Sequence, residues 1–180
     1  MTISMLPIKN MASRHPGLQS CQEECYVKQA TVIMDRYHKP PTEFALRDDD
    51  TKITVLVEWE VPDQNIKAAF ANLTDAKEEG AYAYALASVE LTRGLVAVRR
   101  METLTGGDFY IAPIGTMVDD IENAYKLEVS GTELDESEVK SRVRKKMDQA
   151  RKGTCDLPAI AAVVGFSVKQ ICIKTVEIES

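Results

Sequence analysis

The chain has 180 residues, of which 44% are hydrophobic and 28% charged, and its formal net charge is −6. This length predicts one domain, and this composition is typical of a soluble globular protein. No apolar run approaches the roughly 18 residues of a membrane span, so we expect no membrane partner. The first residues lack the apolar core of a secretory signal, and the four cysteines suit a reduced, cytoplasmic protein. The acidic balance argues against broad, non-specific affinity for nucleic acid.

The first part of the chain is expected to add a small unit to a larger core. Residues 1–17 are predicted to form a flexible extension. Residues 18–73 are predicted to pack on the core as a helix over 18–38, a β-hairpin over 44–59 and a short helix over 64–73. Alternating apolar residues, among them Val55, Val57 and Trp59, give the hairpin one hydrophobic face. A homodimer with its interface on that face is compatible with this pattern.

The remaining residues, 74–180, are predicted to form the core. An alanine-rich helix over 76–93, with Asp75 as its N-cap, ends at Gly94. Strands are expected over 95–101, 108–112, 124–130, 159–166 and 170–178, and a second long helix over 135–152. The order is therefore α-β-β-β-α-β-β. This order predicts an α/β fold with a mixed sheet flanked by helices.

Three acidic residues stand at related points of this core. Glu79 lies at the start of the alanine-rich helix, Asp108 at the start of a strand and Glu128 near the end of the next strand. In a helix-strand-strand-strand unit these three points can meet at one sheet edge. Carboxylates are the ligands that Mg²⁺ or Mn²⁺ requires. Glu128 lies between Leu127 and Val129 in a buried strand, where a carboxylate must be paired, metal-bound or neutral.

The helix over 135–152 is basic in its C-terminal part. Residues 140–152 carry seven cations, with Asp148 as the single acid among them. Such a stretch is commonly a solvated helix face with cations near the negative end of the helix dipole. It is also a candidate surface for contact with nucleic acid.

Gly107-Asp108, Glu128-Val129-Ser130 and Glu79-Gly80-Ala81 together resemble the motifs of the PD-(D/E)xK, restriction-endonuclease-like nuclease superfamily. The likeness covers about residues 75–178. In finer detail, GGDFYI and KLEVSG resemble strings in a group of uncharacterised bacterial proteins with this core. The resemblance implies a restriction-endonuclease-like core with an N-terminal helix and hairpin added to it.

The resemblance also implies roles for individual residues. Glu79, Asp108 and Glu128 would be metal ligands, and the residue two positions after the glutamate would be a catalytic lysine. In this chain that residue is Ser130, which carries no positive charge. Lys126 lies on the same strand face as Glu128 and is an alternative source of the cation. Lys140 and Arg144, in the following helix, are two more.

Two functions follow from these observations. The first is a Mg²⁺-dependent nuclease, or a nucleic-acid-processing protein derived from one, with Glu128, Ser130 and Lys126 at the catalytic site. The second is an adaptor or binding module that keeps the fold and has lost the chemistry. The three acids favour the nuclease, and the absence of the motif lysine favours the adaptor.

Overall fold

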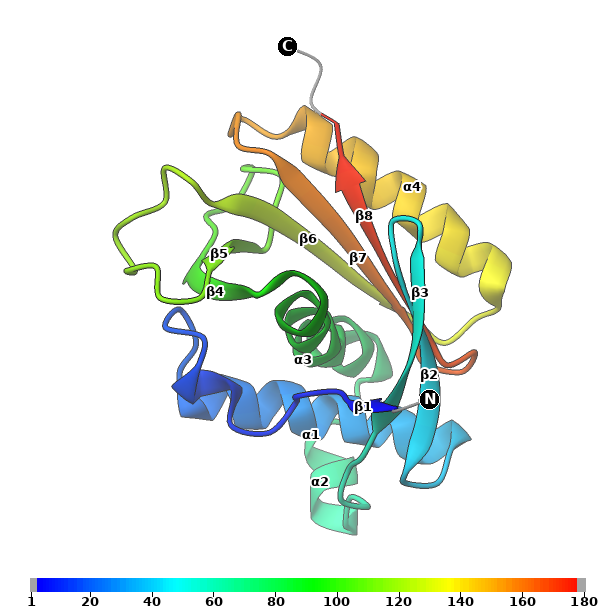
Figure 1. Cartoon of the computed structure of the whole chain (residues 1–180). Helices are drawn as coiled ribbons and strands as arrows, with labels where there is room; N and C mark the ends of the chain where they lie inside the picture. Colours follow the sequence, from blue (N-terminus) through cyan, green and yellow to red (C-terminus); the bar gives the residue numbers. More distant parts are fainter. Residues whose placement is uncertain (1–2, 178–180) are drawn as a thin grey trace.

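The computed structural model describes residues 3–177, and these form one mixed sheet with helices on both of its faces (Figure 1). The eight strands are β1 (Ser4–Met5), β2 (Thr42–Asp48), β3 (Thr51–Val57), β4 (Leu95–Arg100), β5 (Phe109–Pro113), β6 (Tyr125–Thr132), β7 (Ala159–Gly165) and β8 (Gln170–Val176). The α-helices are α1 (Ser20–Tyr37), α2 (Gln64–Ala69), α3 (Leu73–Arg93) and α4 (Glu136–Lys152), and Met11–Ser13 form a short 3-10 turn. Residues 1–2 of the expected extension, and residue 178 of the expected last strand, lie outside the described residues.

The strand order is β1-β3-β2-β8-β7-β6-β5-β4. The strands β4, β5 and β6 are neighbours in this sheet, and each pairs with the next in antiparallel orientation. The connection through α4 then makes β7 parallel to β6. The hairpin of β2 and β3 extends the sheet because β2 pairs with β8. The N-terminal unit therefore contributes strands to the same sheet as the core.

Side-chain alternation along β6 separates the two helical layers. Leu127 and Val129 are buried in the main core with α1 and α3. Lys126, Glu128 and Ser130 point to the other face, where α4 lies. The adjacent strand β7 is buried at every position because it is covered on both faces. Figure 1 shows α3 and α1 on one side of the sheet and α4 on the other.

The N-terminal segment is ordered, and the expectation of a flexible extension is wrong for residues 3–17. Leu6, Ile8, Met11 and His15 are all buried. The segment also covers the outer edge of β4, because Gly17 N donates to Ala97 O at 2.9 Å. Ala97 N in turn donates to Nδ1 of His15 at 2.9 Å. Burial of these apolar side chains and satisfaction of an exposed strand edge both favour the docked conformation.

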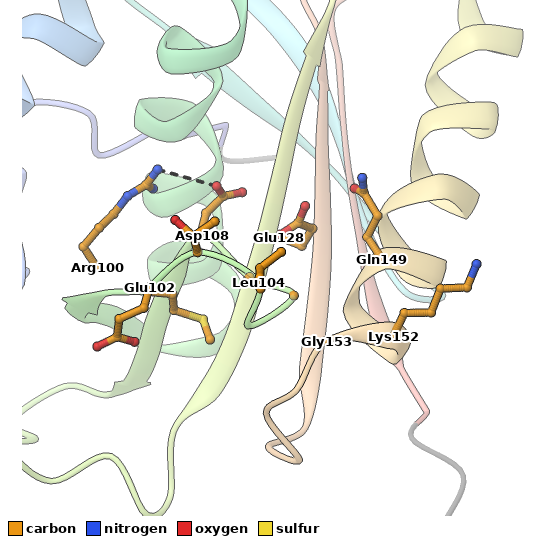
Figure 2. A pocket seen from close by; sticks show the side chains of 12 residues that line it. Arg100, Glu102, Leu104, Asp108, Glu128, Gln149, Lys152 and Gly153 are labelled. Atoms are coloured by element: carbon orange, nitrogen blue, oxygen red, sulfur yellow. Dashed lines mark ion pairs between the residues drawn. The ribbon is translucent and has the colours of Figure 1, made fainter.

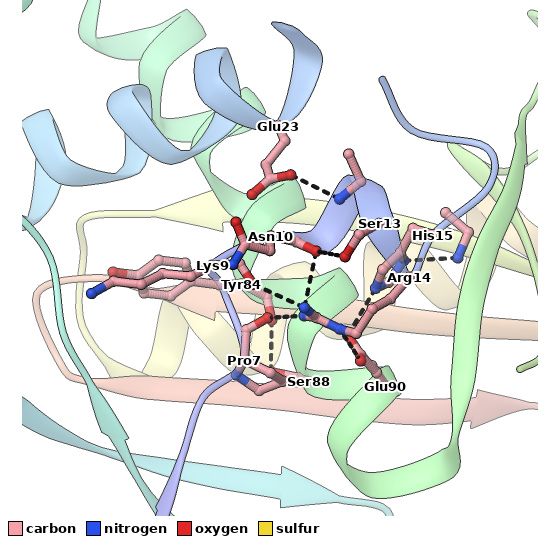
Figure 3. Close-up of polar contacts among 12 residues, drawn as sticks. Pro7, Lys9, Asn10, Ser13, Arg14, His15, Glu23, Tyr84, Ser88 and Glu90 are labelled. Carbon is pink, nitrogen blue, oxygen red and sulfur yellow. Dashed lines mark hydrogen bonds and ion pairs between the residues drawn. The ribbon is translucent and has the colours of Figure 1, made fainter. Parts of the chain in front are cut away.

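A charged cluster fixes the same segment to α3 (Figure 3). Arg14 forms an ion pair with Glu90 and donates to the carbonyl oxygens of Pro7, Lys9 and Asn10. Nε2 of the fully buried His15 lies 2.9 Å from Glu90 Oε2. Because Nδ1 accepts a backbone N–H, a neutral ring donates from Nε2 to Glu90. Burial lowers the pKa of His15, which favours this neutral form.

The apolar face of the hairpin is covered within the chain. Val55 and Val57 are fully buried and Trp59 is 7% exposed, and all three belong to the core that includes α1 and α3. The expectation of a dimer interface on this face is therefore wrong, because the face already packs against α1 and α3 of the same chain. Among residues 3–177, none of the helices has both the length and the apolar character needed to cross a membrane.

Candidate active site at the β5–β6 edge

A cavity of about 470 Å³ opens between the β4–β5 loop, β6 and the C-terminal part of α4. Its lining includes Arg100, Asp108, Glu128, Gln149 and Lys152. Figure 2 shows Asp108 and Glu128 at neighbouring strands, with Gln149 and Lys152 extending from α4 on the other side. The lining also includes Glu102, so the cavity combines three carboxylates with cations from two elements.

Two glycines let the surrounding loops approach each other. Gly106 has a φ of 80°, and a Cβ atom there would lie 2.7 Å from Gly153 Cα. A Cβ atom on Gly153 would lie 2.1 Å from Thr105 O. Larger residues at these positions would therefore force apart the β4–β5 loop and the loop after α4. A Cβ atom on Gly107, the residue before Asp108, would lie 3.2 Å from Lys126 Cβ, so glycine at this position lets the chain approach β6 closely.

Asp108 is held firmly at the entrance of β5. Its backbone N donates to Leu127 O at 2.7 Å, and Oδ2 accepts from Val129 N at 2.8 Å. Oδ1 accepts from the Tyr82 hydroxyl at 3.0 Å. In the antiparallel pairing of β5 with β6, Phe109 lies opposite Leu127. Continuing this register by one residue places Asp108 opposite Glu128. The two acids therefore lie on neighbouring strands and line the same cavity.

Glu128 is 8% exposed and carries a perturbed carboxyl group. Burial raises the pKa of Glu128, and the nearby charge of Asp108 raises it further. Nζ of Lys146 donates to Glu128 Oε1 at 2.7 Å and acts in the opposite direction. A buried acid next to a second acid is the kind of environment in which functional carboxylates are found.

Arg100 supplies a fixed cation on the α3 side of the cavity. Its guanidinium carbon lies 4.6 Å from the ring centroids of Tyr82 and of Phe109. It donates to the Tyr82 hydroxyl at 3.0 Å and lies 3.6 Å from Asp108 Oδ1. Burial and the charge of Asp108 raise the pKa of Tyr82, so its hydroxyl remains a donor. The aromatic contacts hold Arg100 in one orientation while 43% of its side chain stays exposed.

Ser130 is engaged in a separate polar cluster. Its Oγ accepts from Arg142 at 2.9 Å and lies 3.3 Å from Glu78 Oε2, to which it can donate. These residues line a smaller cavity of about 330 Å³, together with Lys145, Lys146 and Gln149. A hydroxyl supplies no cation, so Ser130 does not replace the lysine of the motif it resembles.

Lys126 does not reach the site as expected. It is 1% exposed, and its Nζ donates to Ala150 O at 2.8 Å and to Cys155 O at 2.6 Å. It therefore binds carbonyl groups at the C-terminal end of α4, where the helix dipole favours a cation. The expectation of Lys126 as a catalytic cation is wrong, because its donors are used to hold α4 and the following loop.

Glu79 does not join the other two acids. Its Oε2 accepts from Gln29 Nε2 of α1 at 2.6 Å, and Glu79 is not part of the cavity lining. The next residue, Gly80, lies against α1, where a Cβ atom would be 2.7 Å from Ala30 N. Within residues 3–177, no group of three or more His, Cys, Asp or Glu side chains is placed to hold a metal ion. The expectation of a site with three carboxylates is therefore wrong, and only Asp108 and Glu128 of the three line the cavity.

Lys146 is the main residue that sequence reasoning missed. The sequence suggests Lys140 and Arg144 as the cations on this helix, yet both are exposed, and it is Lys146 that reaches Glu128. The signal was present in the spacing. Lys146 follows the buried Val139 by seven residues and precedes the buried Ala150 by four, which places it on the helix face that meets the sheet.

Comparison of the chain with protein-family models, with curated proteins and with solved structures gives no match. The site's own chemistry therefore carries the functional assignment. Asp108 and Glu128 offer hard oxygen ligands, and a second negative charge raises the pKa of Glu128. Mg²⁺ is commonly held by one or two protein carboxylates, with waters and substrate oxygens completing its coordination. The pair provides fewer protein ligands than the sequence suggested, and its oxygens accept hydrogen bonds from Tyr82, Val129 N and Lys146.

Proposed function

We propose that this protein is a Mg²⁺-dependent phosphodiesterase that cleaves nucleic acid, with Asp108 and Glu128 as metal ligands. The observation that carries the proposal is the ion pair between Lys146 and Glu128 beside Asp108. It supplies, from α4, the cation that Ser130 lacks. The order α3-β4-β5-β6-α4-β7-β8, together with the Gly-Asp and Glu-x-Ser strings, supports a restriction-endonuclease-like core.

Each residue has a definable part in this reaction. A metal bound by the two carboxylates would lower the pKa of a coordinated water and neutralise charge on the phosphate. Lys146 is placed to orient a water near Glu128. Its charge also lowers the pKa of Glu128, which favours the ionised carboxylate. Arg100 and Lys152 lie on opposite sides of the cavity, where they can contact phosphate oxygens.

The basic helix supports nucleic acid as the substrate. Lys140, Arg144 and Lys145 of α4 are exposed, and Lys152 lines the cavity. Cations along one helix beside the carboxylates would follow a phosphate backbone, and binding would weaken with salt. The net charge of −6 restricts such contact to this local surface.

A non-catalytic nucleic-acid-binding module is the second candidate, and two observations favour it. Lys146 already neutralises Glu128, and Ser130 is occupied by Arg142 and Glu78. A site with these pairs is stable without metal. In that case the basic face of α4 would bind nucleic acid and no cleavage would follow.

The two candidates are separated by measuring metal-dependent stability and cleavage on the same variants. Mn²⁺ should raise the melting temperature of the wild type, by the equivalent of about 2.7 kcal/mol at a concentration 100 times its Kd. Asp108→Asn and Glu128→Gln should each remove this increase. Glu102→Gln is the matched control, because Glu102 lines the same cavity while its side chain is 60% exposed; it should behave as wild type.

Cleavage should be tested on single-stranded, duplex and branched DNA and RNA with Mg²⁺ or Mn²⁺. Metal-dependent stabilisation with cleavage that is lost in Asp108→Asn supports the phosphodiesterase. Salt-sensitive binding of the same substrates without cleavage or stabilisation supports the binding module. Cleavage that persists in both carboxylate variants would refute the assignment of this site.

A further inference from the structure

A cavity larger than the two described above lies away from Asp108 and Glu128. A groove of about 700 Å³ runs between the N-terminal segment, α1 and the residues that follow β3. Ile8, Lys9 and Ser13 form one wall, Ser20 to Thr31 of α1 another, and Glu58 to Ile66 the third. None of these residues takes part in the proposed phosphodiesterase site, so the groove needs an explanation of its own.

The N-terminal wall of the groove is preorganised. The Arg14 guanidinium holds the carbonyl oxygens of Pro7, Lys9 and Asn10 while it is paired with Glu90. On the groove side, Glu23 of α1 accepts from Ala12 N at 2.7 Å (Figure 3). A wall fixed at both ends keeps its shape in the absence of a ligand, which lowers the cost of binding.

The chemistry of the groove is apolar at its base and acidic at its rim. Val27 and Ile66 are half-buried, Trp59 is buried, and Val61 is 59% exposed. Five lining residues are acidic and two are lysines: Glu23, Glu24, Glu58, Glu60, Asp63, Lys9 and Lys28. Both lysines are already paired, with Glu58 and Glu24. The rim therefore attracts cations, and Glu60 forms no ion pair within residues 3–177.

Unused hydrogen-bonding groups lie along the third wall. Within the described part of the chain, the backbone N–H groups of Trp59, Glu60 and Val61 donate no hydrogen bond. The indole Nε1 of Trp59 is buried and likewise has no partner among these residues. The segment comes directly after β3, so its free backbone groups can pair with an added chain in the manner of a further strand.

The length of the groove distinguishes a peptide from a small molecule. Its α1 wall runs from Ser20 to Thr31, which at about 1.5 Å per residue is about 16 Å. An extended peptide spans that length with about five residues. We propose that this groove binds a short peptide segment of a partner protein, in which basic side chains alternate with apolar ones. The apolar side chains lie on Val27 and Ile66, and the basic ones reach Glu60 and Asp63.

Trp59 is the only tryptophan, so its fluorescence reports binding directly. The probe is an acetylated and amidated pentapeptide that alternates lysine with leucine, titrated into the full chain. We expect a saturable change in emission that weakens with added salt. The glutamate–leucine counterpart should give no saturable change, and a lysine–serine peptide should bind at least tenfold more weakly.

A matched pair of charge reversals locates the site. Glu60→Lys should weaken binding of the lysine–leucine peptide at least fivefold, since Glu60 is exposed at the rim. Glu122→Lys makes the same change in net charge on an exposed residue outside the groove, and should alter the Kd less than twofold. No saturation at millimolar peptide, equal binding of the glutamate–leucine peptide, or equal effects of the two reversals would each overturn the proposal. Binding of n-butylamine as tight as that of the peptide would also overturn it, in favour of a small-molecule site.

Discussion

Nζ of Lys146 in α4 lies 2.7 Å from Oε1 of Glu128 in β6. The two side chains are 21% and 10% exposed, so the pair is shielded from most of the solvent. The charge of Lys146 opposes the burial and the Asp108 charge that together raise the pKa of Glu128. The pair also joins the helix that carries the basic surface to the strand that carries the carboxylate.

Replacing Lys146 by methionine should remove both the cation and the partner of Glu128. We expect cleavage to fall at least 100-fold, the lower range for loss of a positioned acid–base group. Unfolding free energy should fall by about 1–3 kcal/mol, the cost of leaving a buried acceptor unpaired. Lys145→Met is the control, because Lys145 is the adjacent residue and is exposed. Equal cleavage by the two variants would exclude Lys146 from the reaction.

The raised pKa of Glu128 predicts a dependence of stability on pH. The unfolded carboxyl group titrates near its ordinary value of 4.5, and the folded one titrates higher. Its contribution is therefore fully present below pH 4.5 and is lost as the pH rises through the folded value. Glu128→Gln should flatten this decline in denaturant-melting experiments without metal. Lys146→Met should extend the decline to higher pH, since the cation lowers the pKa of the folded carboxyl group. A Glu128→Gln profile that overlays the wild type would contradict this picture.

Lys126→Met tests a structural role for the buried lysine. The substitution leaves the carbonyl oxygens of Ala150 and Cys155 without their donor. Loss of about 2–3 kcal/mol of unfolding free energy is expected, because both bonds come from a charged group. Mn²⁺-induced stabilisation should persist, since Lys126 does not line the carboxylate cavity. If a folded Lys126→Met protein lost that stabilisation, Lys126 would have a role at the carboxylate site after all.

Glu90→Gln tests the attachment of the N-terminal segment. The change weakens the bonds to Arg14 and His15, so amide exchange at Gly17 and Ala97 should accelerate at least tenfold. Lys9→Met serves as the control, because the Lys9–Glu58 pair is exposed and contributes under about 1 kcal/mol. Unchanged exchange at Gly17 in Glu90→Gln would show that apolar burial alone holds the segment.

The elements of the core were predictable because each has a local cause. The alanine-rich helix ends where Gly94 adopts a φ of 64°, and α4 begins where Asp135 caps two backbone N–H groups. The alternation of apolar and polar residues in β3, and the continuous apolar run in β4, predict those two strands. Order in residues 3–17 was not predictable, since it depends on Arg14 meeting Glu90, a residue 76 positions away.

The sequence by itself determined that Asp108 and Glu128 belong to two consecutive strands, because strand periodicity is a local property. Only the tertiary structure decided which cation serves them. Lys126 and Lys146 are both near Glu128 in sequence terms, one on its strand and one on the next helix. Packing of α4 on the sheet directs Lys126 to the end of that helix and Lys146 to Glu128. Packing of α1 against Gly80 likewise assigns Glu79 to Gln29. Long side chains reach several partners, so the chosen partner follows from how the helices are docked.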